Sequence, residues 1–158
     1  MVDAPFSIAT LKREGFEGWR LFSELRNGES APRCPGVYLV TRPHAPPQFR
    51  TTNMGGWYKG KNPSEDITTL KARWVSDTDL LYVGSSDDLA ARIEALCDFG
   101  LGKPVRHWGG RYIWQIADTE NFQVAWHTTP EHKQKKASVI CAFSSHFNKP
   151  PFANLRAT

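Results

Sequence analysis

Two tyrosines and one arginine are the residues of this chain whose types and spacing are best suited to chemistry. Tyr38 ends the triplet Gly36-Val37-Tyr38, Tyr82 opens the triplet Tyr82-Val83-Gly84, and Arg92 follows Tyr82 by ten residues. A phenol can donate or accept a hydrogen bond, and a guanidinium can bind two phosphoryl oxygens at once. Each residue alone also has a structural explanation, since strand tyrosines are commonly core aromatics and a helical arginine commonly extends to solvent.

The segments that carry these three residues predict two strands and a helix. Residues 37–41 and 80–83 are short apolar runs rich in β-branched and aromatic side chains, which is typical of strands. Residues 84–88 offer a hydroxyl cap and two acids for the first turn of a helix over 89–100. Arg92 lies beside the apolar face of this helix, so we expect its guanidinium at the border of the buried surface.

The rest of the chain predicts one α+β domain over residues 1–158, with a small sheet that carries helices. Residues 7–26 mix helix formers with two glycines and predict two short helices or one broken helix within an N-terminal helical cover, residues 1–34. The breaker-rich residues that follow the first strand predict a long loop. Two alternating runs at 111–117 and 122–126 predict a hairpin, and an apolar stripe predicts a last helix that ends before Pro150.

Composition limits the class of protein. The 158 residues are 40% hydrophobic and 23% charged, which is enough for one compact core. No run approaches the roughly 20 apolar residues that a bilayer span needs, and residues 1–6 lack the features of a secretory signal. Three cysteines without a Cys-x-x-Cys pair argue against a disulfide framework. We therefore expect a cytoplasmic protein that does not bind a membrane.

The excess positive charge lies at the C-terminal end. Residues 127–158 hold five basic residues against Glu131, whereas residues 1–126 hold fifteen basic and fifteen acidic residues. A one-sided basic surface favours a polyanion such as nucleic acid, although a solvated helix face with a basic tail also explains it. Residues 55–61 place Trp57 and Tyr58 beside Lys59 and Lys61. This combination can stack bases and contact phosphates, and it equally suits a hairpin tip folded onto the body.

Taken together, these motifs resemble the GIY-YIG endonuclease family. The resemblance rests on Gly36-Val37-Tyr38, on Leu81-Tyr82-Val83-Gly84, on Arg92 and on the closing segment Pro150-Pro151-Phe152-Ala153-Asn154. It covers residues 35–41 and 80–154. It implies a three-stranded antiparallel sheet flanked by helices, and cleavage of a phosphodiester with one divalent metal, Mg²⁺ or Mn²⁺.

The resemblance also implies roles for individual residues. Tyr38 would be the general base or relay, provided that a neighbouring cation lowers the pKa of its phenol. Tyr82 would position water or phosphate, and Arg92 would be the best-placed cation. His107 would donate a proton to the leaving group or contact phosphate, unless it is an ordinary surface residue. The candidate nucleic-acid contacts are Lys59, Arg111, Lys136 and Asn154.

The chain departs from the family in two places. Lys136 stands where the family's metal-binding glutamate is expected, and an ammonium cannot coordinate a metal. We find no replacement ligand, so the metal ligands stay unknown. Residues 42–79 form a long insertion between the two tyrosine motifs, where the family has a short connection. Such an insertion is often functional, and a structural cover for the sheet edge is the alternative.

Three hypotheses about function follow. The first is a nucleic-acid phosphodiesterase of GIY-YIG type with an altered metal site, with DNA favoured over RNA as its partner. The second is a catalytically inactive nucleic-acid-binding module of the same fold, which needs no metal. The third is an intracellular protein-interaction domain that uses its Trp-rich loops. Oligomeric state stays open.

Overall fold

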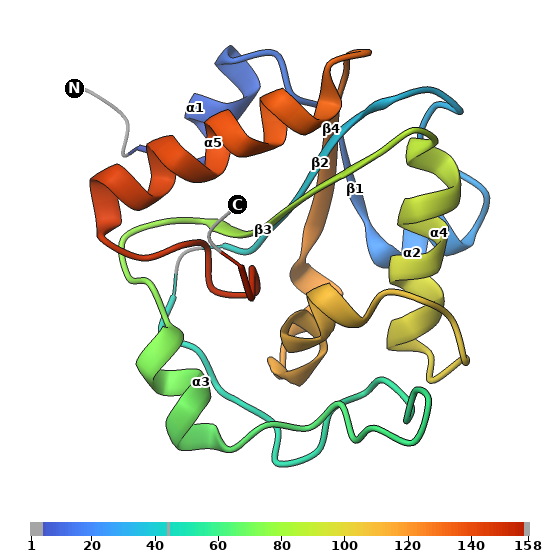
Figure 1. The fold of residues 1–158 in the computed structure, drawn as a ribbon, viewed down its shortest axis with the longest axis vertical. Helices are drawn as coiled ribbons and strands as arrows, with labels where there is room; N and C mark the ends of the chain where they lie inside the picture. The colour runs from blue at the N-terminus through green and yellow to red at the C-terminus, as the bar shows by residue number, and fades with distance from the viewer. Residues whose placement is uncertain (1–4, 44, 157–158) are drawn as a thin grey trace.

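The computed structural model describes residues 5–43 and 45–156 and has an α+β architecture. Four antiparallel strands form one sheet in the order β1-β4-β2-β3, with helices packed on both faces (Figure 1). Outside the described residues lie positions 1–4 of the predicted N-terminal cover, position 44 of the insertion, and positions 157–158 at the end of the predicted domain. Within the described residues, no helix is long and apolar enough to cross a membrane.

Strand β2 (Gly36–Thr41) lies inside the sheet, and all six of its residues are buried. It pairs antiparallel with β3 (Leu80–Ser86) on one side and with β4 (Gln123–Thr128) on the other, and β4 also pairs with β1 (Glu17–Leu21). Strand β3 is therefore an edge strand. Its outer edge is covered by the C-terminal segment, where the Ala153 amide donates to the Leu81 carbonyl at 2.9 Å.

The helices form a layer on each face of the sheet. Helices α1 (Ile8–Arg13) and α5 (His132–Phe147) cover one face, and α2 (Phe22–Arg26) and α4 (Leu89–Gly100) lie on the other (Figure 1). Side chains alternate along β2, so Val37 and Leu39 pack with α5, while Tyr38 faces α4. This alternation puts the first of the two phenols on the same side of the sheet as Arg92.

The sheet has four strands, so the expectation of three was wrong. The additional strand is β1, which lies in the segment for which we expected helices. Gly15 and Gly18 both adopt positive φ angles, 98° and 96°, and so interrupt a helix. A Cβ atom at Gly18 would lie 2.6 Å from the Trp126 ring, so only glycine lets β1 approach β4 this closely.

The expected hairpin over 111–117 and 122–126 was also wrong in its first half. Residues Trp108–Gln115 form a 3₁₀ helix, η1, and only the second run belongs to a strand, β4. The side chains of four successive residues, 112–115, are buried. They are enclosed between the sheet and the insertion, so the apparent alternation does not mark two faces of a strand.

The insertion, residues 42–79, is anchored to the body along much of its described length. It contains helix α3 (Ile67–Arg73) and runs beneath the sheet in Figure 1. The Gln115 amide nitrogen donates to the carbonyls of Arg50, at 3.0 Å, and Glu65, at 2.7 Å. The Asn53 amide nitrogen donates to the Arg111 carbonyl at 2.8 Å. These buried or partly buried hydrogen bonds hold the insertion against η1.

The close approach of Tyr38 explains why the second tyrosine motif ends in a glycine, Gly84. In the β2–β3 pair, Gly84 lies directly opposite Tyr38. A Cβ atom at Gly84 would lie 2.3 Å from Cζ and 2.5 Å from the hydroxyl oxygen of Tyr38. Because Tyr38 is only 1% exposed, its ring has little room to move aside.

We therefore predict that Gly84→Ala destabilises the protein by about 1–3 kcal/mol, the usual cost of forcing extra atoms into a packed core. Gly109→Ala is the matched control, since the nearest atom to its added Cβ would be the Tyr82 hydroxyl at 4.0 Å. Urea unfolding measures both variants. Equal unfolding midpoints for the two variants would contradict the packing role of Gly84.

Candidate functional site

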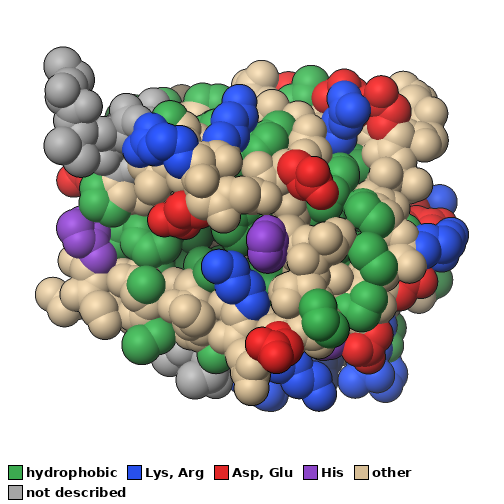
Figure 2. Space-filling model, turned by 90° about the horizontal axis from the view of Figure 1, so that it is seen from above, with side chains coloured by type: hydrophobic (Ala, Val, Ile, Leu, Met, Phe, Trp, Pro, Cys, Tyr) green, Lys and Arg blue, Asp and Glu red, His purple; other side chains and the backbone are tan. Residues whose placement is uncertain are grey.

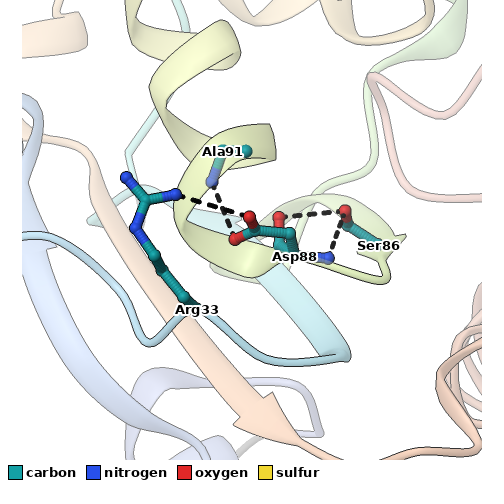
Figure 3. A network of polar contacts seen from close by, with 4 residues as sticks. All are labelled: Arg33, Ser86, Asp88 and Ala91. Carbon is teal, nitrogen blue, oxygen red and sulfur yellow. Dashed lines mark hydrogen bonds and ion pairs between the residues drawn. The ribbon is translucent and has the colours of Figure 1, made fainter.

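The start of α4 is fixed by a network of polar contacts that positions Arg92 (Figure 3). The Asp88 carboxylate accepts a hydrogen bond from the Ala91 amide at 3.2 Å and forms an ion pair with Arg33 at 3.4 Å. The Ser86 hydroxyl accepts from the Asp88 amide at 3.0 Å. Asp88 is thus the N-cap, and neither predicted acid lies inside the first turn. Arg92 follows one turn later.

The side chain of Arg92 crosses from α4 to the segment before η1. Its Nη1 donates to the backbone carbonyl of Arg106. This contact ties the guanidinium to the residue next to His107. The helix cap and the Arg106 carbonyl together restrict where the charge of Arg92 can lie.

Behind Arg92, three aromatic side chains form a buried cluster of Tyr38, Tyr82 and His107. The Tyr38 hydroxyl and His107 Nε2 are 2.8 Å apart. The ring centroids of Tyr82 and His107 are 5.7 Å apart in an edge-to-face arrangement, and those of the two tyrosines are 5.9 Å apart. A Cβ at Gly110 would lie 2.6 Å from His107, so the glycine at this position makes room for the imidazole. The spacing motifs therefore bring together residues from β2, β3 and the segment before η1.

Burial raises the pKa of both phenols. For Tyr38, burial and the neighbouring Tyr82 outweigh the opposing charge of Arg92, and the pKa rises well above its ordinary value. The pKa of Tyr82 also rises, chiefly through burial. The expected lowering of the Tyr38 pKa by a nearby cation is therefore overridden. Both phenols stay protonated at neutral pH and serve as hydrogen-bonding groups.

His107 is fully buried, so the possibility that it is an ordinary surface residue is wrong. Burial and, second, the positive charge of Arg92 lower its pKa to about 3. The imidazole is neutral at pH 7 and carries no proton that it would readily give to a leaving group. Its Nδ1 has no hydrogen-bond partner in the structure. The buried, neutral imidazole of His107 is thus suited to hydrogen-bond with the Tyr38 hydroxyl.

Lys136 extends the site from the other face of the sheet. It lies on α5 and is partly buried. Burial lowers the pKa of its ammonium, and the charges of Arg92 and of Arg156 lower it further. Both charges that act on Lys136 are positive. Lys136 thus lies within electrostatic reach of both Arg92 and Arg156 near the edge strand β3, and an anion beside it would relieve this repulsion.

The residues at this site do not fit a divalent metal ion. Mg²⁺ and Mn²⁺ prefer carboxylate ligands, and the site supplies none. Its groups are two protonated phenols, a buried neutral imidazole, two guanidiniums and an ammonium. The Asp87 carboxylate instead contacts His132 Nε2 at 2.8 Å. Across residues 5–43 and 45–156, no group of three or more His, Cys, Asp and Glu side chains is placed to hold a metal ion.

The other predicted contact residues have separate surroundings. Asn154 is buried, and its amide accepts from the Val83 amide and donates to the Val83 carbonyl, both at 2.9 Å, so its side chain fastens the C-terminal segment to β3. Arg111 lies over the rings of Trp108, at 4.4 Å, and Tyr112, at 5.2 Å. Lys59 is exposed on the insertion, over the ring of Tyr58.

Sequence reasoning did not identify Arg156 as part of the site. Its only sequence signal is its place two residues after Asn154. Surface charge outside the site gives little guidance, because basic and acidic side chains are interspersed over the face in Figure 2. The local cluster around Arg92, rather than the net charge of +4, therefore distinguishes the site.

The depressed pKa of His107 predicts that acid destabilises the fold. The unfolded chain binds a proton on His107 near pH 6.5 and the folded protein only near pH 3, so this contribution is present above pH 6.5 and is lost as pH falls toward 3. Between pH 7.5 and pH 5, His107 should account for about 2 kcal/mol of lost unfolding free energy. Urea unfolding at both pH values should show a smaller loss in His107→Gln than in the parent protein. An equal loss in both would contradict the assignment.

Comparisons with known proteins add no assignment. No family model, curated protein or solved structure matches this chain.

Proposed function

We propose that this chain is a nucleic-acid-binding domain of GIY-YIG-like type that binds a backbone phosphate, with DNA as the favoured partner. The observation that carries the proposal is the placement of Lys136 within electrostatic reach of Arg92 and Arg156, whose charges add to burial in lowering the pKa of its ammonium. A guanidinium and an ammonium beside one another suit a phosphate with two free oxygens.

The aromatic cluster supports this function by fixing the site. Arg92 donates to the backbone next to His107, and His107 contacts Tyr38 in the core. The guanidinium of Arg92 is therefore held in place before a ligand arrives, which lowers the entropy lost on binding. The neutral state of His107 and both tyrosines leaves positive charge as the dominant electrostatic feature of the site.

Phosphodiester hydrolysis at the same site is a second candidate. The observation that favours it is the buried contact of 2.8 Å between Tyr38 and His107, because phosphate binding alone needs no such pair. A phenol and an imidazole can relay a proton. The raised pKa of Tyr38 and the lack of a fit for a divalent metal favour binding as the leading proposal.

Substitution of the cations should weaken nucleic-acid binding. We predict that Arg92→Ala and Lys136→Ala each lower the affinity for an oligonucleotide about 10- to 150-fold, because each removes a charge-assisted hydrogen bond. Each change should also reduce the salt dependence of binding by about one phosphate contact. Fluorescence anisotropy over a salt series measures both quantities.

Lys133→Ala is the matched control for these variants. Lys133 is exposed on the same helix, α5, and its removal takes away the same charge. We expect less than a threefold change in affinity. Equal effects of Lys133→Ala and Lys136→Ala would contradict a specific site and indicate diffuse charge attraction.

A cleavage assay separates the two candidates. We predict that the protein binds single-stranded DNA, plasmid and RNA without cutting them, in Mg²⁺, in Mn²⁺ or with chelator, because the site lacks the donors for a divalent metal. Gel electrophoresis detects any product. Cleavage that disappears in Arg92→Ala would replace the binding proposal with hydrolysis.

A further inference from the structure

Two segments that are distant in the sequence lie together beside the site. They are residues 52–64 of the insertion and residues 101–111, which lead from α4 into η1. The Asn53 amide nitrogen donates to the Arg111 carbonyl at 2.8 Å. A Cβ at Gly56 would lie 2.8 Å from the Gly102 carbonyl oxygen. The insertion is therefore packed along the segment that carries Arg106, whose carbonyl holds Arg92.

These two segments carry basic residues and no acidic ones. Lys103 forms an ion pair with Asp98 of α4 at 3.3 Å, so part of its charge is offset. Four of the five basic side chains are exposed, and Arg111 is the exception. The surface between the insertion and the site is thus suited to a polyanion. The five basic residues are Lys59, Lys61, Lys103, Arg106 and Arg111.

Trp57 lies on the first of these two segments, residues 52–64, and is exposed. Its side chain is 65% exposed, and among the described residues the other exposed large hydrophobic side chain is Leu101, at 53%. Gly55, two residues before Trp57, packs against Phe99, and its amide donates to the Asn53 side chain at 2.7 Å. The loop is therefore anchored close to Trp57. An anchored loop that presents an exposed indole offers a rigid surface for stacking.

The distance from Arg92 to this region suits a short stretch of nucleic acid. Leu101, which caps α4, follows Arg92 by nine positions, which is roughly 13 Å along the helix axis at about 1.5 Å per residue. One strand of nucleic acid advances about 3.4 Å per stacked nucleotide, so about four nucleotides cover this distance. A strand whose phosphate lies at Arg92 can thus bring a base to the insertion.

We propose that Trp57 is a stacking site for an unpaired base of a DNA strand whose backbone is bound at Arg92 and Lys136. This inference rests on the proposed function and names its substrate class, single-stranded DNA. An indole stacks on an open base face, which paired and stacked bases in a duplex do not present. The five basic side chains outnumber the two acids that act on Lys103 and Arg111, Asp98 and Glu65, and this excess favours a nucleic acid over a protein as the occupant.

The test uses a fluorescently labelled oligothymidylate of 12 nucleotides and an abasic strand of the same length and charge. We expect Trp57→Ala to weaken binding of the oligothymidylate about 5- to 150-fold, the usual effect of losing one base-stacking residue. Binding of the abasic strand should be unchanged. Trp57→Phe should restore most of the affinity, because phenylalanine retains a stacking face.

The outcomes separate this inference from the proposal on which it rests. If Trp57→Ala binds the oligothymidylate as well as the parent protein does, while Arg92→Ala binds it weakly, the stacking site is overturned and the phosphate site stands. Equal weakening for the abasic strand also overturns stacking. If the parent protein binds neither strand, the proposed function fails too. Thermal melting confirms that the exposed position 57 tolerates substitution.

Discussion

The hydroxyl of Tyr38 and Nε2 of His107 lie 2.8 Å apart in a region from which water is excluded. This contact joins the inner strand β2 to the segment before η1. Since the carbonyl of the neighbouring Arg106 accepts from Arg92, the position of the guanidinium depends on the same contact. In a region of low dielectric constant, a hydrogen bond between a phenol and an imidazole is stronger than in water, and it satisfies Nε2 of the buried His107.

The distribution of charge follows from this packing. Burial keeps Tyr38, Tyr82 and His107 neutral, so the net charge of the site comes from groups at its border. Lys136 approaches from α5, on the opposite face of the sheet, because β3 is an edge strand that both helical layers reach. Lys136 therefore supplies positive charge beside β3 from a side chain of the protein itself rather than from a bound ion. The site therefore attracts an anion and repels a metal cation.

Local patterns in the sequence predicted the α+β class, β2, β3, and the helix that carries Arg92, because these elements have strong apolar patterns. They did not predict β1, whose approach to β4 depends on Gly18 meeting Trp126 across about a hundred residues. The contacts that anchor the insertion, such as those of Gln115 with Arg50 and Glu65, also join residues far apart in the sequence and leave no local pattern. His107 was a candidate as a histidine just before a predicted strand, but only the three-dimensional packing shows that its imidazole is buried and neutral.

The central claim is that Arg92 and Lys136 form one anion site, and the titration of the Lys136 ammonium tests it most directly. Nuclear magnetic resonance of ¹³C-labelled lysine can follow this group with and without a short oligonucleotide. The account predicts a pKa below the ordinary lysine value in the free protein and a rise when the oligonucleotide binds, since a phosphate stabilises the charged form. An ordinary pKa in the free protein that does not respond to the oligonucleotide would contradict the account.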